Sequence, residues 1–374
     1  MKVLHIGKYY PPFFGGIEKV NFDLVENLNL KEDCQVDELC CHHSVHNEPL
    51  PEPSGYRLFR APLFTIKFST PISFRFFDIY RRIRNNYDII HWHLPNPVAT
   101  MAALIFPTRA KVVLHWHSDI VKQKKLRKIY KPLQTMLLRR ADRIIVTSQN
   151  YFNGSLDLQP YKEKVRVIPI GVDLEHLAFP EGTDQRIQAA YPGKKIILSI
   201  GRLTYYKGFR YLIEAAQYLG EDKMVLIGGV GELQAELERQ IADLGVGDRV
   251  RLVGSIPKAE IGAYFKAADL FCLPSIARAE AFGVVLAEAL AMGVPIVSCD
   301  IPDSGVNWVN LHDQTGINVP VCNASALAEA INGLLESPDS MEGFRKRCRE
   351  RYNSFFSMEK MVDAVYALYQ DVLA

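Results

Sequence analysis

The sequence of 374 residues has no long apolar run. No stretch approaches the roughly 18 consecutive apolar residues that a bilayer-spanning helix requires. Residues 1–7 are too short for the core of a signal peptide, and we expect them to form a first β-strand. With 48% hydrophobic and 23% charged residues, the composition is that of an ordinary globular protein, and the length predicts two domains with separate cores.

The sequence also lacks two common signatures. Its seven cysteines are odd in number and include no C-x-x-C pair, which argues against a disulfide framework or a structural zinc site and favours a reducing cytoplasm. No G-x-G-x-x-G follows the first predicted strand. This absence disfavours a nicotinamide- or flavin-dependent oxidoreductase.

Charge is divided unevenly along the chain. Residues 1–175 contain 25 Lys and Arg against 17 Asp and Glu, whereas the remainder contains 19 against 25. The densest basic stretch, residues 121–140, has eight cations, no acid and interleaved apolar residues. It predicts a helix at an anionic membrane surface or a plain solvated helix face; nucleic acid ranks third because no recognition motif accompanies it.

Apolar runs that alternate with helical patterns predict two doubly wound α/β domains. Residues 47–72 are rich in proline and predicted to be irregular, after which Ser73 caps a helix over 74–84 with four aromatics and four arginines. We favour a surface helix with inward aromatics over a membrane-interface helix. The last helix, 358–373, has an apolar seam formed by Met361, Val362, Val365, Leu368, Tyr369 and Val372.

Two features fall where strands of the first domain are predicted to end. Gly15 and Gly16 follow the first strand, and they indicate either a close backbone approach to a ligand or a simple tight turn. Two further strands end in His-x-His, at 91–93 and 115–117. Residues two apart on a strand share a face, so these histidines could chelate a metal, but we favour contacts with substrate or with each other. His117 is a candidate for substrate contact or proton transfer.

In the second domain, Arg202 and Lys207 flank a turn from strand to helix. Two cations on such a turn can neutralise a diphosphate, although isolated surface charge is an equal alternative.

Residues 277–295 are predicted to be the loop and helix of a strand-loop-helix-strand unit, between buried strands at 269–275 and 295–298. The helix predicted from about Phe282 to residue 292 is almost wholly apolar, and Gly293 closes it. Glu288 is its only charge, and Glu280 lies just before its first turn, where Gly283 would let an anion approach the free amides. On a helix, eight residues rise about 12 Å, so the two carboxylates could reach different ends of one ligand. The alternative is a capping Glu and a satisfied core Glu.

Together, Gly15–Gly16, His117, Arg202 with Lys207, and Glu280 with Glu288 make the chain resemble the retaining glycosyltransferases of family 4. The resemblance implies the GT-B fold, in which two Rossmann-like domains face each other across a cleft and the C-terminal helix crosses back to the first domain. The expected divisions are an acceptor domain over 1–175, a donor domain over 176–352 and the returning helix over 353–374.

The resemblance also implies roles for the site residues. Arg202 and Lys207 would bind the donor diphosphate, with the amides of Phe282, Gly283, Val284 and Val285 adding contacts. Glu280 would bind the sugar, Glu288 the ribose, and His117 would lie beside the transferred sugar, where it would position and polarise it and need not act as a general base. Gly15 and Gly16 would line the cleft, and the nucleotide base would lie near Gly254, Ser255 and Ile256.

Within this family, residues 117–120, 278–283 and 304–308 most resemble bacterial enzymes of O-antigen and exopolysaccharide synthesis. This resemblance implies mannose transfer from GDP-mannose to a saccharide on undecaprenyl diphosphate, at the cytoplasmic face of the membrane and without nucleic acid. No Asp-x-Asp pair occurs, which argues against a metal requirement. No cofactor is expected besides the nucleotide-sugar donor. The rival hypotheses are a UDP-sugar transferase of the same fold and a noncatalytic nucleotide-sugar-binding protein.

Overall fold

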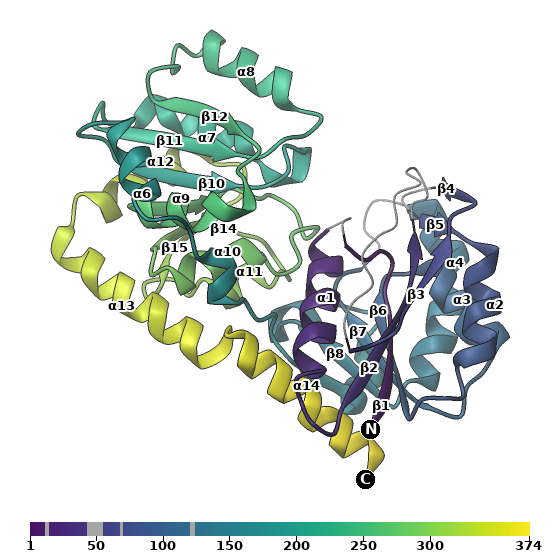
Figure 1. Cartoon of the computed structure of the whole chain (residues 1–374). Helices are drawn as coiled ribbons and strands as arrows, with labels where there is room; N and C mark the ends of the chain where they lie inside the picture. Colours follow the sequence, from purple (N-terminus) through teal and green to yellow (C-terminus); the bar gives the residue numbers. More distant parts are fainter. Residues whose placement is uncertain (12–14, 43–54, 68–69, 120–123) are drawn as a thin grey trace. The chain divides into compact units, whose positions relative to one another are not determined.

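The computed structural model describes residues 1–11, 15–42, 55–67, 70–119 and 124–374, without the side chains of 124–129 and 338–340. The chain divides into two compact units (Figure 1). Unit 1 comprises residues 1–147, 155–169 and 361–374, and unit 2 comprises residues 148–154 and 170–360. Each unit is a parallel sheet with helices on both faces, as the alternating sequence pattern predicts.

Unit 1 contains a seven-stranded sheet in the order β3-β2-β1-β6-β7-β8-β9, with every neighbouring pair parallel. The strand bounds are β1 Lys2–Ile6, β2 Gln35–His42, β3 Leu58–Pro62, β6 Ile89–Leu94, β7 Lys111–Trp116, β8 Arg143–Val146 and β9 Val165–Val167. Because β1, β6 and β7 are parallel neighbours, their carboxyl ends lie together at one edge of the sheet.

The helices of unit 1 include α1 Gly16–Leu28, α2 Phe74–Ile83, α3 Pro97–Ile105 and α4 Lys124–Arg140. The predicted cap of α2 is confirmed, because the Ser73 hydroxyl accepts a hydrogen bond from the Phe76 amide. Helix α14, Met358–Leu373, contributes residues 361–374 to unit 1, and every residue of its predicted apolar seam is buried. This helix therefore returns to the first unit, as the GT-B resemblance implies.

Unit 2 contains a six-stranded parallel sheet in the order β12-β11-β10-β13-β14-β15. The strand bounds are β10 Lys195–Ile200, β11 Lys223–Gly228, β12 Val250–Gly254, β13 Leu270–Leu273, β14 Ile296–Asp300 and β15 Gly316–Pro320. Its helices are α5 Gln149–Asn153, α6 Thr183–Ala189, α7 Phe209–Ala215, α8 Gln234–Asp243, α9 Ile261–Ala267, α10 Val284–Ala291, α11 Val306–Val309, α12 Ala324–Leu335 and α13 Pro338–Phe355.

The prediction of irregular structure over 47–72 is wrong for its described second half. β3 forms an edge of the unit 1 sheet, and β4 Thr65–Lys67 pairs with β5 Thr70–Ile72 in a short antiparallel ribbon. The prolines did not prevent pairing because Pro62 ends an edge strand and Pro71 lies in a two-stranded ribbon, positions where a missing N–H is tolerated. Residues 47–54 lie outside the described residues.

Within the described residues, no helix is both long enough and apolar enough to cross a bilayer.

Candidate functional site

The candidate site residues of unit 2 lie at the ends of three strands, β12, β10 and β13. Gly254 ends β12, and Arg202 comes two residues after β10. Glu280 lies in the loop between β13 and α10. Because β12, β11, β10 and β13 are adjacent and parallel, these residues lie along one edge of the sheet, where open α/β sheets bind ligands.

Lys207 and Glu280 form a buried ion pair at this edge. The Nζ of Lys207 lies 2.6 Å from Oε2 of Glu280, and each side chain is only 11% exposed. Burial lowers the pKa of Lys207, but the Glu280 carboxylate more than offsets this, so the pKa lies above its ordinary value. Lys207 is therefore charged, and Glu280 compensates its charge. Arg202, in contrast, is exposed.

Two glycines allow Lys207 to occupy this position. At Gly201 a Cβ would come within 3.1 to 3.3 Å of the Lys207 side chain, so the lysine packs against bare backbone. Gly208 follows Lys207 with a φ of +66°, and a Cβ there would lie 2.0 Å from the carbonyl oxygen of Pro274. Backbone geometry therefore requires glycine at position 208, directly after the lysine that pairs with Glu280.

The loop that carries Glu280 is held from two sides. Ser275 Oγ donates to Glu280 Oε2 over 2.9 Å. The Ser304 hydroxyl donates to the Glu280 carbonyl, and the Gly305 amide donates to the Ala281 carbonyl over 2.8 Å. Arg278 donates to the carbonyls of Asp303 and Tyr151. Two of the three segments that carry the sequence resemblance to O-antigen enzymes, 278–283 and 304–308, are therefore joined by hydrogen bonds.

Helix α10 begins later than the sequence predicted. Gly283, with a φ of +77°, is its N-cap, and no side chain caps its first amides. Phe282 is buried and packs edge-to-face on Phe356. Gly293, with a φ of +68°, follows the helix and closes it as predicted. The uncapped amides of Val284 and its neighbours leave this terminus open to an anion.

Glu280 lies outside α10, in a turn, so the predicted helical relation between Glu280 and Glu288 is wrong. The reason is Gly283, whose left-handed backbone forms the N-cap, so that the helix starts at Val284, four residues after Glu280. Glu288 lies on α10 and is half-buried. Its distance from Glu280 is set by the fold of the loop and not by helical rise.

The predicted base-binding segment lies at the same edge of unit 2. The Gly229 amide donates to the Gly254 carbonyl over 2.7 Å, and the Gly201 amide donates to the Gly228 carbonyl over 2.9 Å. Ser255 is exposed, and Ile256 is half-buried. A Cβ at Gly228 would lie 2.4 Å from Cδ1 of Ile256, which packs against it.

In unit 1, five histidines form a buried cluster across three adjacent strands. His5 lies on β1, His91 and His93 lie on β6, His115 lies on β7, and His117 directly follows β7. His93 Nδ1 is 2.9 Å from His117 Nε2, and His93 Nε2 is 3.2 Å from His5 Nδ1. The expectation that the strand-end histidines contact each other is therefore confirmed.

The tyrosine hydroxyl of α14 joins the rest of the cluster. Tyr369 Oη lies 2.9 Å from His5 Nε2 and also bonds His91 Nδ1, while His91 Nε2 is 3.3 Å from His115 Nδ1. Burial lowers the pKa of His5 to about 4 and that of His117 to about 3, and holds the other three imidazoles well below the ordinary value of 6.5. All five rings are neutral at pH 7.

Three of these histidines have a spacing that a metal ion could bridge. Ring nitrogens of His91, His93 and His115 lie within 4.8 Å of one another, and all three side chains are buried. These rings already have hydrogen-bond partners: His91 bonds His115 and Tyr369, and His93 bonds two other histidines of the cluster.

The glycine pair of unit 1 marks the start of α1. Gly15 is the N-cap, with a φ of −115°, and Gly16 is the first helical residue. Both are exposed, and a Cβ on Gly16 would meet no atom within 4 Å. Neither backbone conformation nor packing among the described residues requires glycine at position 16. The preceding residues 12–14 lie outside the described part of the chain.

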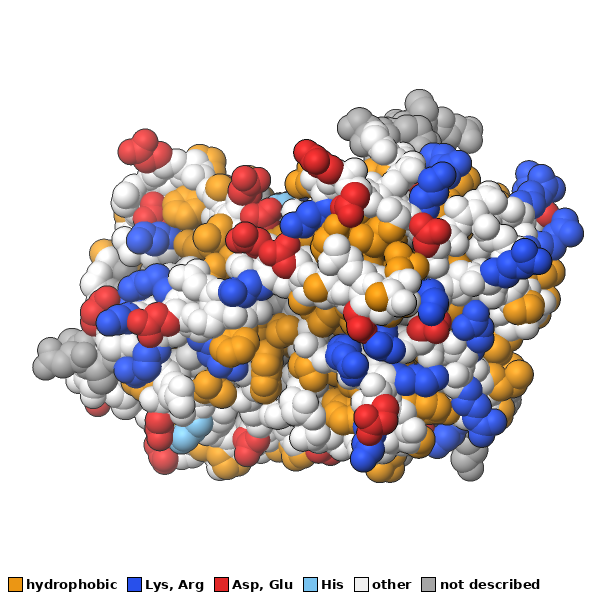
Figure 2. All heavy atoms as spheres, turned by 90° about the horizontal axis from the view of Figure 1, so that it is seen from below, with side chains coloured by type: hydrophobic (Ala, Val, Ile, Leu, Met, Phe, Trp, Pro, Cys, Tyr) orange, Lys and Arg blue, Asp and Glu red, His pale blue; other side chains and the backbone are white. Residues whose placement is uncertain are grey.

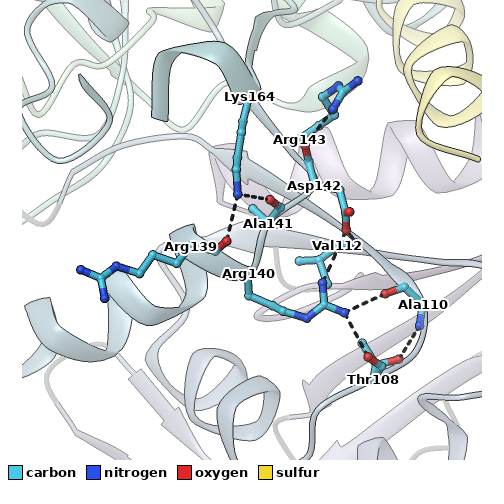
Figure 3. Close-up of polar contacts among 9 residues, drawn as sticks. All are labelled: Thr108, Ala110, Val112, Arg139, Arg140, Ala141, Asp142, Arg143 and Lys164. Carbon is cyan, nitrogen blue, oxygen red and sulfur yellow. Dashed lines mark hydrogen bonds and ion pairs between the residues drawn. The ribbon is translucent and has the colours of Figure 1, made fainter. Parts of the chain in front are cut away.

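The Lys and Arg side chains of unit 1 include some that face solvent and some that bond backbone carbonyls. On the face that Figure 2 shows, Lys and Arg side chains are spread over this unit, with fewer Asp and Glu among them. Some of them have structural tasks at the end of α4: Lys164 donates to the carbonyls of Arg139 and Ala141, and Arg140 donates to those of Thr108 and Ala110 (Figure 3). Of the predicted membrane patch, 121–140, residues 121–123 and the side chains of 124–129 lie outside the described set.

A pocket of about 480 Å³ lies elsewhere in unit 2, between β15, α12 and α13. Its lining is mostly apolar, contains no cation and includes none of the predicted site residues: Ile317, Val319, Ala326, Glu329, Ala330, Gly333, Leu334 and Phe344. It therefore lacks the positive charge that a diphosphate would need.

Three contributing residues escaped the sequence analysis. His5 stands alone on its strand and so has no His-x-His pattern. Tyr369 was assigned to an apolar seam, and its hydroxyl gave no local signal. Ser275 was part of the predicted strand region before the Glu280 loop, yet no sequence spacing connects it to the carboxylate that it supports.

Comparison with known proteins agrees with this architecture. The family model described as Glycosyltransferase Family 4 matches residues 14–176, and that described as Glycosyl transferases group 1 matches residues 181–351. The O-antigen chain mannosyltransferase C of Escherichia coli is 32% identical over 100% of this chain and 99% of its own length. D-rhamnosyltransferase WbpZ of Pseudomonas aeruginosa is 33% identical over 96% of this chain and 92% of its own length.

Solved structures match the fold over nearly the whole chain. Sucrose-phosphate synthase from Thermosynechococcus elongatus has a TM-score of 0.80 at 24% identity, covering 99% of this chain and 98% of that one. Anabaena HepE in complex with UDP has a TM-score of 0.80 at 20% identity, and the match covers 99% of this chain and 100% of that one. The family models and the relative that matches along its whole length show that the chain belongs to the group 1, family 4 glycosyltransferases, and its two parallel α/β units have the GT-B fold.

Proposed function

We propose that this glycosyltransferase moves mannose from GDP-mannose to a saccharide carried on undecaprenyl diphosphate, during synthesis of a bacterial surface polysaccharide. The observation that carries the proposal is the buried Lys207–Glu280 pair beside exposed Arg202, at the strand-end edge of unit 2. Similarity along the whole chain to an O-antigen chain mannosyltransferase supports the choice of mannose and of pathway.

The proposed chemistry uses this geometry directly. Cleavage of the sugar–phosphate bond builds negative charge on the leaving diphosphate, which Arg202, Lys207 and the first amides of α10 stabilise. Glu280 binds hydroxyls of the sugar, and Glu288 binds the ribose. Because Glu280 also pairs with Lys207, sugar and phosphate recognition are linked through one salt bridge.

Transfer with retention follows if the departing phosphate accepts the acceptor proton on the same face of the sugar. His117 then positions and polarises the sugar, with no need to act as a base. Gly15 and Gly16 allow a ligand to approach the start of α1, and the Gly254–Ser255–Ile256 segment borders the nucleotide base through its backbone. No metal is required in this scheme, because fixed cations and amides serve the diphosphate.

The experiment is a donor panel with a lipid-linked saccharide acceptor, measuring release of the free nucleotide. We expect turnover with GDP-mannose, an α-linked product by NMR of the anomeric proton, and less than about twofold loss in EDTA. Silence with GDP-mannose together with turnover of UDP-glucose, UDP-galactose or UDP-N-acetylglucosamine would refute the donor. A β-linked product would refute retention, and EDTA inactivation restored by Mg²⁺ or Mn²⁺ would refute metal independence.

One alternative has its own support: transfer of D-rhamnose, because a D-rhamnosyltransferase is 33% identical over nearly the whole chain. D-Rhamnose is 6-deoxymannose, so the two donors differ by one hydroxyl group. GDP-mannose and GDP-D-rhamnose should therefore be compared by kcat/KM in the same assay, and the larger value decides between them.

A noncatalytic nucleotide-sugar-binding protein is a separate alternative. Substituting Glu280→Ala should then leave function in cells intact, whereas our proposal predicts a large loss of transfer. Circular dichroism and thermal unfolding of the variant provide the control for folding.

A further inference from the structure

The histidine cluster of unit 1 connects to Glu38 on β2, and this connection fixes the direction of its hydrogen bonds. The Gly7 amide donates to Glu38 Oε1 over 3.0 Å, and a backbone N–H can only donate. Because Glu38 Oε1 is an acceptor, the Asn21 group 2.9 Å from it is the Nδ2 amide. Asn21 Oδ1 therefore faces His5 and accepts a hydrogen bond from its Nδ1–H over 3.0 Å.

From His5 the direction passes along one branch to His117. A neutral imidazole has one N–H and one acceptor nitrogen, and burial keeps these rings neutral by lowering each pKa. With its hydrogen on Nδ1, His5 also faces His93 Nε2 at 3.2 Å, which must then be an acceptor. His93 carries its hydrogen on Nδ1 and donates to His117 Nε2 over 2.9 Å. The hydrogen of His117 is left on Nδ1.

The second branch agrees with this direction at its far end. His5 Nε2 accepts from the Tyr369 hydroxyl, whose oxygen accepts from His91 Nδ1–H. His91 Nε2 then accepts from His115 Nδ1–H, so His115 Nε2 is a bare acceptor. This nitrogen is buried without a partner among the described residues. The reverse direction would place an unpaired N–H there, and unpaired buried N–H groups are the rarer case.

The series of hydrogen bonds ends at His117, which is 5% exposed. Its Nε2 is engaged by His93, whereas Nδ1 has no hydrogen-bond partner among the residues that the structure describes. His117 follows β7 at the carboxyl edge of the unit 1 sheet, where α/β sheets bind ligands. The free nitrogen is therefore the one that a ligand can meet.

We propose that Glu38 and Asn21 are positioning residues that act through His5 and His93 to hold His117 in the Nδ1–H tautomer, which offers the transferred sugar a hydrogen-bond donor. The contact with the sugar rests on the proposed function, whereas the tautomer does not. A neutral donor suits the reaction, since it orients a sugar hydroxyl without placing a full positive charge beside an anomeric carbon that itself becomes positive. The acceptor proton then goes to the departing phosphate and not to His117.

The first test is spectroscopic and needs no substrate. Two-bond ¹H–¹⁵N correlation spectra of the full chain with ¹⁵N-labelled imidazoles distinguish protonated from bare ring nitrogens. His117 should show a protonated Nδ1 and a bare Nε2 from pH 6 to 8. A protonated Nε2, or two protonated nitrogens in this range, overturns the proposal.

The second test removes the hydrogen bonds of one branch of the network at a time, on either side of His5. In His93→Phe the link to His117 is lost, so His117 should shift toward the Nε2–H form and kcat should fall about tenfold, equivalent to about 1.4 kcal/mol. Tyr369→Phe is the matched control, because it cuts the other branch and leaves Asn21 bound to His5; the His117 tautomer should not change. An unchanged tautomer in a folded His93→Phe protein overturns the proposal.

The third test asks whether Glu38 acts through its acceptor oxygen. Glu38→Gln keeps an oxygen for Gly7 and Asn21 and should retain the His117 tautomer and activity, whereas Glu38→Leu should lose both. Equal behaviour of these two variants overturns the role of Glu38. Where a variant fails to fold, the spectrum of the unaltered protein still decides the matter.

A metal ion would use the same ring nitrogens. Metal analysis after dialysis should find no stoichiometric zinc, and added Co²⁺ should give no ligand-field absorption. A tightly bound equivalent that disappears in His91→Asn would overturn the hydrogen-bonded network. If His117 has the expected tautomer but no donor in the panel is turned over, the proposed function fails while the network stands.

Discussion

Lys207 and Glu280 form the buried ion pair of the unit 2 edge, with 2.6 Å between Nζ and Oε2. The two residues come from loops that follow adjacent parallel strands, β10 and β13. Ser275 adds a hydrogen bond to the same carboxylate oxygen. The pair therefore joins two loops mechanically while it places one cation and one anion at the candidate donor site.

Breaking this pair should cost stability and activity by separate routes. Glu280→Gln leaves Lys207 buried without its anion and should lower the free energy of unfolding by roughly 3 kcal/mol. The double variant Lys207→Met/Glu280→Leu should recover most of that stability, because no unpaired charge remains, yet stay inactive. Urea denaturation and the transfer assay measure the two effects. Additive losses of stability in the double variant would show that the charges do not act as a pair.

Sequence reasoning placed the parts of this site but not their contact. The Arg202–Lys207 turn and the loop before α10 are local features, which spacing and glycine positions predict. The contact of Lys207 with Glu280 depends on the order of β10 and β13 in the sheet, which no local pattern encodes. For the same reason the helical relation assumed for Glu280 and Glu288 was wrong, since one left-handed glycine changed where α10 begins.

The histidine cluster shows the same limit in unit 1. Each His-x-His pair was visible because two residues apart on a strand share a face. His5 lies on β1 and Tyr369 on α14, near opposite ends of the sequence. Only the folded chain brings these two residues to the other histidines. The short strands β3, β4 and β5 were missed because proline-rich edge strands have little periodicity to detect.

The buried imidazoles should make unit 1 sensitive to acid. Burial holds the pKa of His5 at about 4 and that of His117 at about 3, against 6.5 ordinarily. Below pH 6.5 the unfolded chain binds protons that the folded chain does not, so stability falls as pH falls toward 4. The loss is up to about 1.4 kcal/mol per pH unit for each histidine, and the contribution is fully present above pH 6.5.

Glu38 works in the opposite direction within this window. Burial raises its pKa well above 4.5, so acidification favours the folded form and offsets the loss from one histidine. Hydrogen exchange by mass spectrometry at pH 7.0 and 5.0 should show greater loss of protection in β1, β6 and β7 than in β10 and β13. Equal loss in the two sheets would contradict this expectation.

Gly16 should matter for activity and not for folding. A Cβ at this position meets no atom within 4 Å, and alanine is the better helix former, so Gly16→Ala should leave stability unchanged or raise it by up to about 1 kcal/mol. If ligand approaches the start of α1 as we propose, kcat/KM should fall at least about tenfold. Gly333→Ala, in α12 with equally open space, is the matched control and should leave transfer unchanged. Full activity of Gly16→Ala would remove the glycine pair from the site.

Membrane binding is the last expectation, and it depends on the basic stretch before and within α4. Liposomes containing anionic lipid should bind the protein, and binding should weaken as salt screens the charges. Lys124→Gln/Lys125→Gln should cost about 2 kcal/mol, or roughly 30-fold in affinity, at about 1 kcal/mol per basic residue. The matched control, Arg109→Gln/Lys111→Gln, removes two exposed cations near the start of β7. If both double variants lose the same affinity, the attraction comes from the net charge of unit 1 and α4 is not a specific membrane-binding surface.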